Sequence, residues 1–154
     1  RGEIPEVWDA WRAWKTSEKN AGDSDCGGLN TPMQAEHLKR GAAAEALAAT
    51  HLERHGLTIL ARNVRCRGGE VDLIAEDKGS IVFVEVRLRS SARFGGAAAS
   101  ITNTKQRRII IAAQTWLNGA GQRHASRACR FDAILLDGLD SARIEWLRGA
   151  FDAG

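Results

Sequence analysis

No long apolar run occurs in this sequence, and that absence argues against a protein that spans a membrane with helices. Such a span needs roughly eighteen consecutive apolar residues. The first ten residues, RGEIPEVWDA, also lack the basic start and apolar stretch of a secretory signal. With 44% hydrophobic and 27% charged residues, the composition is typical of a globular domain. We therefore expect a cytoplasmic protein without a membrane partner.

Cysteine is scarce as well. The three cysteines, Cys26, Cys66 and Cys129, are far apart, and none belongs to a C-x-x-C motif or a Cys/His pair. This pattern argues against a disulfide framework and a zinc site. We expect buried or inert thiols in a reducing cytoplasm.

Acidic residues are missing from one long stretch, although the whole chain carries a net charge of only +3. No Asp or Glu occurs between Val86 and Phe131. The basic residues of this stretch are Arg87, Arg89, Arg93, Lys105, Arg107, Arg108, Arg123, Arg127 and Arg130. Such asymmetry favours a positive surface for a polyanion, and nucleic acid is the partner that we expect. The alternative is a solvated basic face with no partner.

Residues 1–33 are predicted to be an N-terminal extension of a domain that covers residues 34–154. The piece SEKNAGDSDCGGLNTP is polar and rich in glycine, as is typical of a flexible linker. Before it, three tryptophans between positions 8 and 14 have the spacing of one side of a short helix. These tryptophans would dock either on the domain or on a partner.

The hydrophobic patterns predict a mixed α/β domain with the order helix, three strands, helix, two strands. Helices are predicted at residues 34–55 and 102–118. Strands are predicted at residues 57–63, 70–77, 81–89, 129–137 and 142–147, with loops at 90–100 and 119–126. The short link between the second and third strands indicates a hairpin.

Two acidic residues fall inside the apolar runs of this hairpin. With Lys78 and Gly79 as its tip, counting outward places Asp72 directly opposite Glu85. Like charges in such a cross-strand pair are destabilising, and burial adds to the cost. A divalent cation would offset both charges, because hard metals such as Mg²⁺ take oxygen ligands. Arg87, on the same face as Glu85, is the rival source of positive charge.

Each predicted helix also directs a charged residue toward the sheet. Glu45 is spaced by seven residues from both Leu38 and Leu52, so we expect it to point with these leucines toward the core. Lys105 shares a stripe with Ile109 and other apolar residues, so its ammonium is expected to lean toward the sheet. The alternatives are a solvated Glu45 at the edge of its stripe and a Lys105 that extends to solvent.

With these residues in place, the chain resembles the YraN-like family of bacterial proteins. The matching stretches run from about residue 38 to 151 and include GGEVDLIAED, IVFVEVRLRSSARFGG and RFDAILL. No single motif is decisive, but the ordered set is specific. The resemblance implies a restriction-endonuclease-like fold, related to that of archaeal Holliday-junction resolvases, with a mixed central sheet flanked by helices.

The family pattern is an aspartate followed by Glu-x-Lys, assisted by an acid on the first helix. By position, the resemblance implies that Asp72, Glu85 and Glu45 are catalytic and hold the metal. Arg87 stands where the pattern has lysine, and arginine cannot lose its proton to act as a base. It could still hold a water or stabilise charge on a phosphate, and Lys105 is a second candidate to assist.

These residues predict a metal-dependent endonuclease that hydrolyses phosphodiester bonds in DNA with Mg²⁺ or Mn²⁺. Arginines of the acid-free stretch would grip phosphates, namely Arg89, Arg93, Arg107, Arg108 and Arg123. Scarce aromatic residues favour duplex or branched DNA over single strands. The alternative is a weakened or inactive nuclease-fold protein that only binds nucleic acid. The likeness to resolvases also implies a homodimer, on fold analogy alone. Glu70 is either a further ligand or a structural turn residue.

Overall fold

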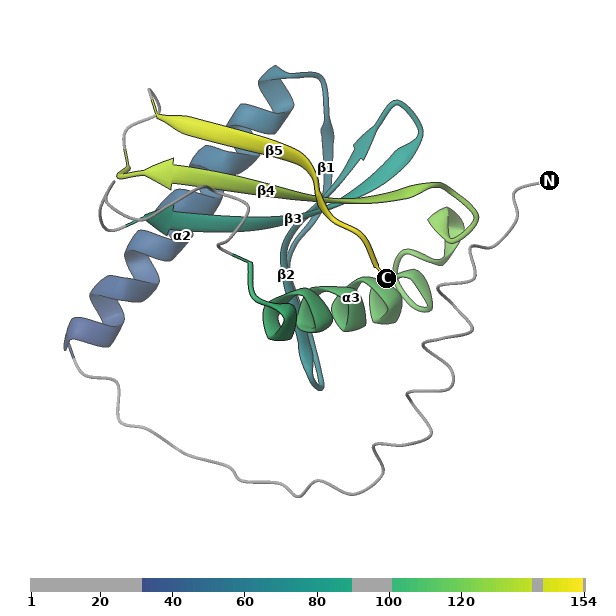
Figure 1. Cartoon of the computed structure of the whole chain (residues 1–154), viewed down its shortest axis with the longest axis horizontal. Coiled ribbons are helices and arrows are strands. Elements are labelled where there is room, and N and C mark those ends of the chain that lie inside the picture. The colour runs from purple at the N-terminus through teal and green to yellow at the C-terminus, as the bar shows by residue number, and fades with distance from the viewer. Residues whose placement is uncertain (1–31, 90–100, 140–142, 154) are drawn as a thin grey trace.

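The computed structural model describes residues 32–89, 101–139 and 143–153 (Figure 1). The predicted extension with its three tryptophans, up to position 31, and the predicted loop at 90–100 lie outside these residues. The elements are, in order, α2 (Pro32–Arg54), β1 (Thr58–Cys66), β2 (Gly69–Asp77), β3 (Ser80–Arg89), α3 (Asn103–Leu117), the 3-10 turn η2 (Gln122–His124), β4 (Cys129–Asp137) and β5 (Ile144–Phe151). This order of helices and strands is the one that the sequence predicts.

The five strands form one mixed sheet in the order β1-β2-β3-β4-β5. β3 and β4 are parallel, and every other neighbouring pair is antiparallel. α3 lies in the connection between the two parallel strands, as parallel pairing requires a crossover. The predicted class, an α/β fold with a mixed sheet flanked by helices, is therefore confirmed. It is consistent with a nuclease-like fold.

The central strand β3 is buried on both of its faces. Val82 and Val84 belong to the core that packs against α2. Ile81 and Phe83, which alternate with them, belong to the core that packs against α3. This double burial explains why β3 contains the continuous apolar run IVFV rather than an alternating pattern.

The first part of α2 is exposed, which corrects the predicted leucine stripe. The helix packs on the sheet through Ala44, Ala48, Ala49 and Leu52, each 2% exposed or less. Leu38, in contrast, is 62% exposed, because the N-terminal end of α2 extends beyond the strands (Figure 1). Helical spacing indicates the direction of a side chain, but it does not indicate where the sheet beneath it ends.

Two expectations drawn from composition are addressed by the described residues. Cys66 and Cys129 are free thiols; Cys66 is half-buried and Cys129 is exposed, so neither has the full burial that was one of the two expectations. The position of Cys129 at the start of β4 leaves its side chain outside the core. Neither α2 nor α3 combines the length and the hydropathy that crossing a bilayer demands.

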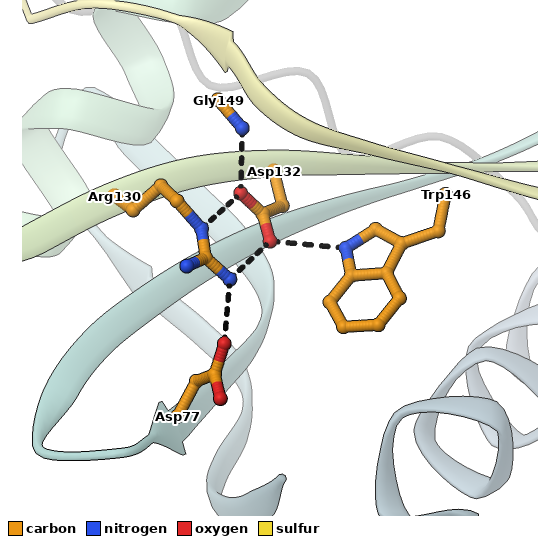
Figure 2. Close-up of polar contacts among 5 residues, drawn as sticks. All are labelled: Asp77, Arg130, Asp132, Trp146 and Gly149. Carbon is orange, nitrogen blue, oxygen red and sulfur yellow. Dashed lines mark hydrogen bonds and ion pairs between the residues drawn. The ribbon is translucent and has the colours of Figure 1, made fainter. Parts of the chain in front are cut away.

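A buried polar network fixes β5 on β4 (Figure 2). Asp132 is 0% exposed, and its carboxylate accepts hydrogen bonds from the Arg130 guanidinium, Trp146 Nε1 and the Gly149 backbone N–H at 2.8–3.0 Å. Arg130 also donates to Asp77, at the end of β2, over 3.1 Å. The β4–β5 register shifts beside Asp132, so the network holds the two strands together where their pairing is irregular.

Candidate metal centre

The β2–β3 hairpin brings Asp72 and Glu85 together. A two-residue turn at positions 78–79 links the strands, and both of its residues have positive φ, as the favoured hairpin turn requires. The register continues to the pairing of Leu73 with Val84, which places the next residues outward, Asp72 and Glu85, opposite each other. The register predicted by counting from the turn is confirmed from Asp77–Ser80 to Leu73–Val84, and the side chains of Asp72 and Glu85 interact just beyond it.

The two carboxylates differ in their partners. Asp72 Oδ2 accepts a hydrogen bond of 2.8 Å from the Val86 backbone N–H. Glu85 is only 4% exposed, and its Oε2 is buried without a hydrogen-bond partner. Burial, followed by the negative charge of Asp72, raises the pKa of Glu85 to about 8, although Lys105 opposes the shift. Glu85 is therefore a buried carboxyl group that lacks sufficient positive charge.

Lys105 supplies the positive charge nearest to Glu85. Its Nζ lies 2.7 Å from Glu70 Oε1 and 3.3 Å from Glu85 Oε1. The expectation that Lys105 leans toward the sheet is thus confirmed, and the alternative of a solvent-directed lysine is wrong. Burial opposes the charge of Lys105, but the hydrogen bond to Glu70 and the nearby carboxylates raise its pKa overall.

Close packing of α3 on the start of β2 explains why Lys105 reaches Glu70. Gly69 precedes Glu70, and a Cβ atom at Gly69 would lie 2.5 Å from the Arg108 carbonyl oxygen and 2.7 Å from the Ala112 nitrogen. Only glycine lets the two backbones approach so closely. Sequence reasoning left the role of Glu70 open. The available signal was its position two residues before Asp72, which places both on one side of a strand.

Glu45 is half-buried on α2 and belongs to the electrostatic surroundings of Asp72. Burial raises its pKa, a hydrogen bond from the Asn63 side chain lowers it, and the charge of Asp72 raises it. Across the described ranges, no three acidic, histidine or cysteine side chains gather closely enough to enclose a metal ion. The close pair is Asp72 and Glu85, with Glu45 as a neighbouring charge.

The oxygen atoms of this pair fit a hard divalent cation. Mg²⁺ and Mn²⁺ prefer carboxylate oxygens and usually need only one or two of them, with water completing the coordination. Glu85 Oε2, which has no partner, and the facing Asp72 carboxylate provide that donor set. The residues present are therefore compatible with the ion that the resemblance implies.

Arg87 does not supply the positive charge at Glu85. It is exposed, and the cation that contacts Glu85 is Lys105. The interpretation of Arg87 as the rival partner of Glu85 is therefore wrong. Lys105 of α3 takes that place, 3.3 Å from Glu85 Oε1. Arg89 lies in β3, but the structure does not describe its side chain. Arg93 lies outside the described residues.

The acid-free stretch is less positive in the folded chain than in the sequence. Arg127 pairs with Glu76 at 2.8 Å, Arg130 pairs with Asp77 and Asp132, and Arg108 lies 3.8 Å from Glu70. Acids from neighbouring strands thus neutralise part of the stretch. The remaining predicted phosphate contacts that the structure describes are exposed, namely Arg107, Arg108 and Arg123.

Comparisons with known proteins find a family described as "Uncharacterised protein family UPF0102", whose profile matches residues 44–136. A UPF0102 protein of Methylobacillus flagellatus is 54% identical over 110 residues, which cover 71% of this chain and 94% of the relative. A UPF0102 protein of Dechloromonas aromatica is 53% identical over 114 residues, or 74% and 89% of the two chains. One of Saccharophagus degradans is 48% identical over 117 residues, or 76% and 96%. The matched range contains Glu45, Asp72, Glu85 and Lys105.

Proposed function

Because this chain belongs to the UPF0102 family and sets Asp72 against Glu85, we propose that it is a metal-dependent endonuclease that hydrolyses phosphodiester bonds in DNA. The single observation that carries the proposal is the buried Glu85 carboxylate, which faces a second carboxylate and has one oxygen without a partner. Ionising both acids on these buried strands is costly, because like charges there are destabilising, and a divalent ion between them would offset that cost.

Asp72 and Glu85 would hold the ion, with Glu45 close enough to add negative charge. A bound divalent ion supplies a water of lowered pKa and neutralises charge on the phosphate. The Val86 N–H fixes the Asp72 carboxylate in position by the hydrogen bond described above. Glu85 must lose its proton before it can act as a ligand, and a bound cation favours that ionised form.

Basic residues of the chain would bind and orient the DNA. Lys105 lies beside Glu85 and can donate a hydrogen bond to a phosphate oxygen at the acidic pair. Arg87 is exposed on the same strand, where a guanidinium could stabilise anionic oxygen but could not act as a base. Arg107 and Arg123 would contact flanking phosphates without reading sequence. Duplex or branched DNA is the substrate class that we propose.

The experiment is DNA cleavage in the presence of Mg²⁺ or Mn²⁺, with duplex, branched and single-stranded substrates. We expect wild-type cleavage that EDTA abolishes and that Asp72→Asn and Glu85→Gln each reduce by roughly a hundredfold or more. Glu76→Gln is the matched control, since Glu76 lies on the same strand as Asp72 but pairs with Arg127. Absence of metal-dependent cleavage on every substrate contradicts the enzymatic proposal.

A second candidate function is a nuclease-fold protein that binds nucleic acid without cutting it. Two observations favour it: Arg87 stands in place of the pattern's lysine, and Lys105 already contacts Glu85. This candidate predicts salt-sensitive DNA binding that EDTA leaves unchanged, with no cleavage. Cleavage gained by Arg87→Lys supports it, whereas efficient cleavage by the wild type removes it.

A further inference from the structure

Lys105 occupies a position in α3 that works against a lysine directed toward the sheet. It lies in the first turn of the helix, where Thr102 Oγ1 accepts a hydrogen bond from its backbone N–H. That turn contains no acidic residue, and the partial positive charge of a helix N-terminus disfavours a cation there. A long lysine side chain at such a site ordinarily extends into water. Its observed direction therefore requires a partner outside the helix.

Glu70 is that partner. The distance from Lys105 Nζ to Glu70 Oε1, 2.7 Å, is shorter than the 3.3 Å to Glu85 Oε1. The Glu70 and Lys105 side chains are 31% and 23% exposed, so water screens their interaction only in part. The hydrogen bond from Lys105 lowers the pKa of Glu70 below its ordinary value.

We propose that Glu70 is a positioning residue that holds the Lys105 ammonium beside Glu85, where Lys105 meets the phosphate of a bound nucleic acid. This inference rests on the proposed function and assigns different roles to Glu70, Asp72 and Glu85. Asp72 and Glu85 hold the ion. Glu70, whose Oε1 is engaged by Lys105 and lies 3.8 Å from the Arg108 guanidinium, acts only through Lys105.

A double-mutant cycle in cleavage rate separates this role from that of a metal ligand. At saturating Mn²⁺, we expect Glu70→Ala and Lys105→Met each to slow single-turnover cleavage on the order of tenfold or more. In the Lys105→Met background, Glu70→Ala is expected to change the rate by less than about twofold, because Lys105, the group through which Glu70 is proposed to act, is gone. Glu70→Gln, which keeps an oxygen acceptor, should recover part of the rate.

Glu76→Ala is the control for the loss of an ion pair from β2. The Glu76–Arg127 pair, at 2.8 Å, contains no residue of the site, and the Glu76 side chain is 32% exposed, close to the 31% of Glu70. We expect the cleavage rate of Glu76→Ala to equal that of the wild type. If Glu70→Ala slows cleavage as much in the Lys105→Met background as in the wild type, the proposal is overturned, since a metal ligand or a structural residue would act without Lys105.

A second measurement needs no cleavage. In the metal-free protein, ¹⁵N-edited NMR of lysine ammonium groups should show a slowly exchanging signal that disappears in Lys105→Met. We expect Glu70→Ala to abolish this signal and Glu76→Ala to leave it in place. If the wild type cleaves no DNA, the proposed function fails while this result still decides the role of Glu70. A signal that persists in Glu70→Ala contradicts the proposal.

Discussion

Glu85 faces Asp72 across the β2–β3 hairpin, and the two carboxylates are supported differently. The Val86 N–H donates to Asp72, whereas one oxygen of Glu85 is buried without a partner. Of the two acids, Glu85 is therefore the one that is harder to ionise in the metal-free protein. That asymmetry makes Glu85 the most informative position for measurements of both pH dependence and metal binding.

The stability of the metal-free protein should depend on the ionisation of Glu85. Its pKa is raised from 4.5 to about 8 in the folded state, so the folded chain holds a proton that the unfolded chain has lost within this window. The stabilisation is fully present below about pH 4.5 and is lost as pH rises toward 8. In EDTA, the free energy of unfolding of the wild type should fall across this range relative to Glu85→Gln, measured by urea titration. A constant difference between the two proteins contradicts the expectation.

Divalent ions should stabilise the folded chain through the same pair. A ligand that binds only the folded state at about a hundred times its Kd adds about 2.7 kcal/mol. We expect Mn²⁺ to raise the Tm of the wild type in a concentration-dependent manner, and to leave Asp72→Asn and Glu85→Gln unchanged. Glu45→Gln should show a reduced but measurable increase, because Glu45 contributes charge near Asp72. Equal increases in wild type and Glu85→Gln place the ion elsewhere.

The contact between β2 and α3 should tolerate no side chain at Gly69. The added Cβ would meet backbone atoms of α3 at 2.5 and 2.7 Å, which cannot move independently of the helix. We expect Gly69→Ala to lower the free energy of unfolding by about 2 kcal/mol or more. Gly41→Ala, on α2, is the matched control, since a Cβ added there would meet no atom of another residue within 4 Å. Helix propensity should make this change stabilising by up to about 1 kcal/mol. Denaturant titration measures both.

The buried network around Asp132 should contribute to stability through charge more than through any single hydrogen bond. Asp132→Asn removes the fully buried charge that pairs with the Arg130 guanidinium, although Arg130 keeps its ion pair with Asp77, and breaking a buried ion pair costs about 3 kcal/mol or more. Trp146→Phe removes the indole N–H that donates to Asp132 together with part of the ring, and the lost hydrogen bond accounts for about 1 kcal/mol of the expected smaller loss. Unfolding curves in urea test the ranking, and a larger loss in Trp146→Phe would contradict it.

DNA binding should draw on arginines that acids do not neutralise. Arg107 is exposed and has no ion pair among the described residues, whereas Arg127 is paired with Glu76 at 2.8 Å. We expect Arg107→Gln to reduce the slope of log affinity against log salt by about 1. Arg127→Gln should change the slope less, since its charge is already compensated. Fluorescence anisotropy at several salt concentrations measures both slopes, and equal effects contradict the distinction.

Local rules in the sequence were sufficient for the hairpin and for its two acids. A two-residue turn fixes the register of an antiparallel pair, so counting from Lys78 and Gly79 placed Asp72 opposite Glu85. The order of helices and strands followed from hydrophobic periodicity in the same way. Both inferences concern residues that are close in the chain.

Features that depend on distant segments were harder to predict. Leu38 shares the helical stripe of Leu52, but it is exposed because the sheet does not extend beneath it. The neutralisation of Arg127 by an acid of β2 depends on which strands become neighbours. The partner of Lys105 follows from the close approach of α3 to Gly69, which no local pattern indicates. The contact between Lys105 and Glu70 joins residues 35 positions apart, where spacing alone carries no information.

The most direct measurement of the central claim is the position of Mn²⁺ in crystals of the protein, located by its anomalous scattering. We predict a peak within direct coordination distance of carboxylate oxygens of both Asp72 and Glu85. The same crystals should show Lys105 still bonded to Glu70. A protein saturated with Mn²⁺ that shows no peak at Asp72 and Glu85, with Lys105 as the only cation there, would contradict the claim.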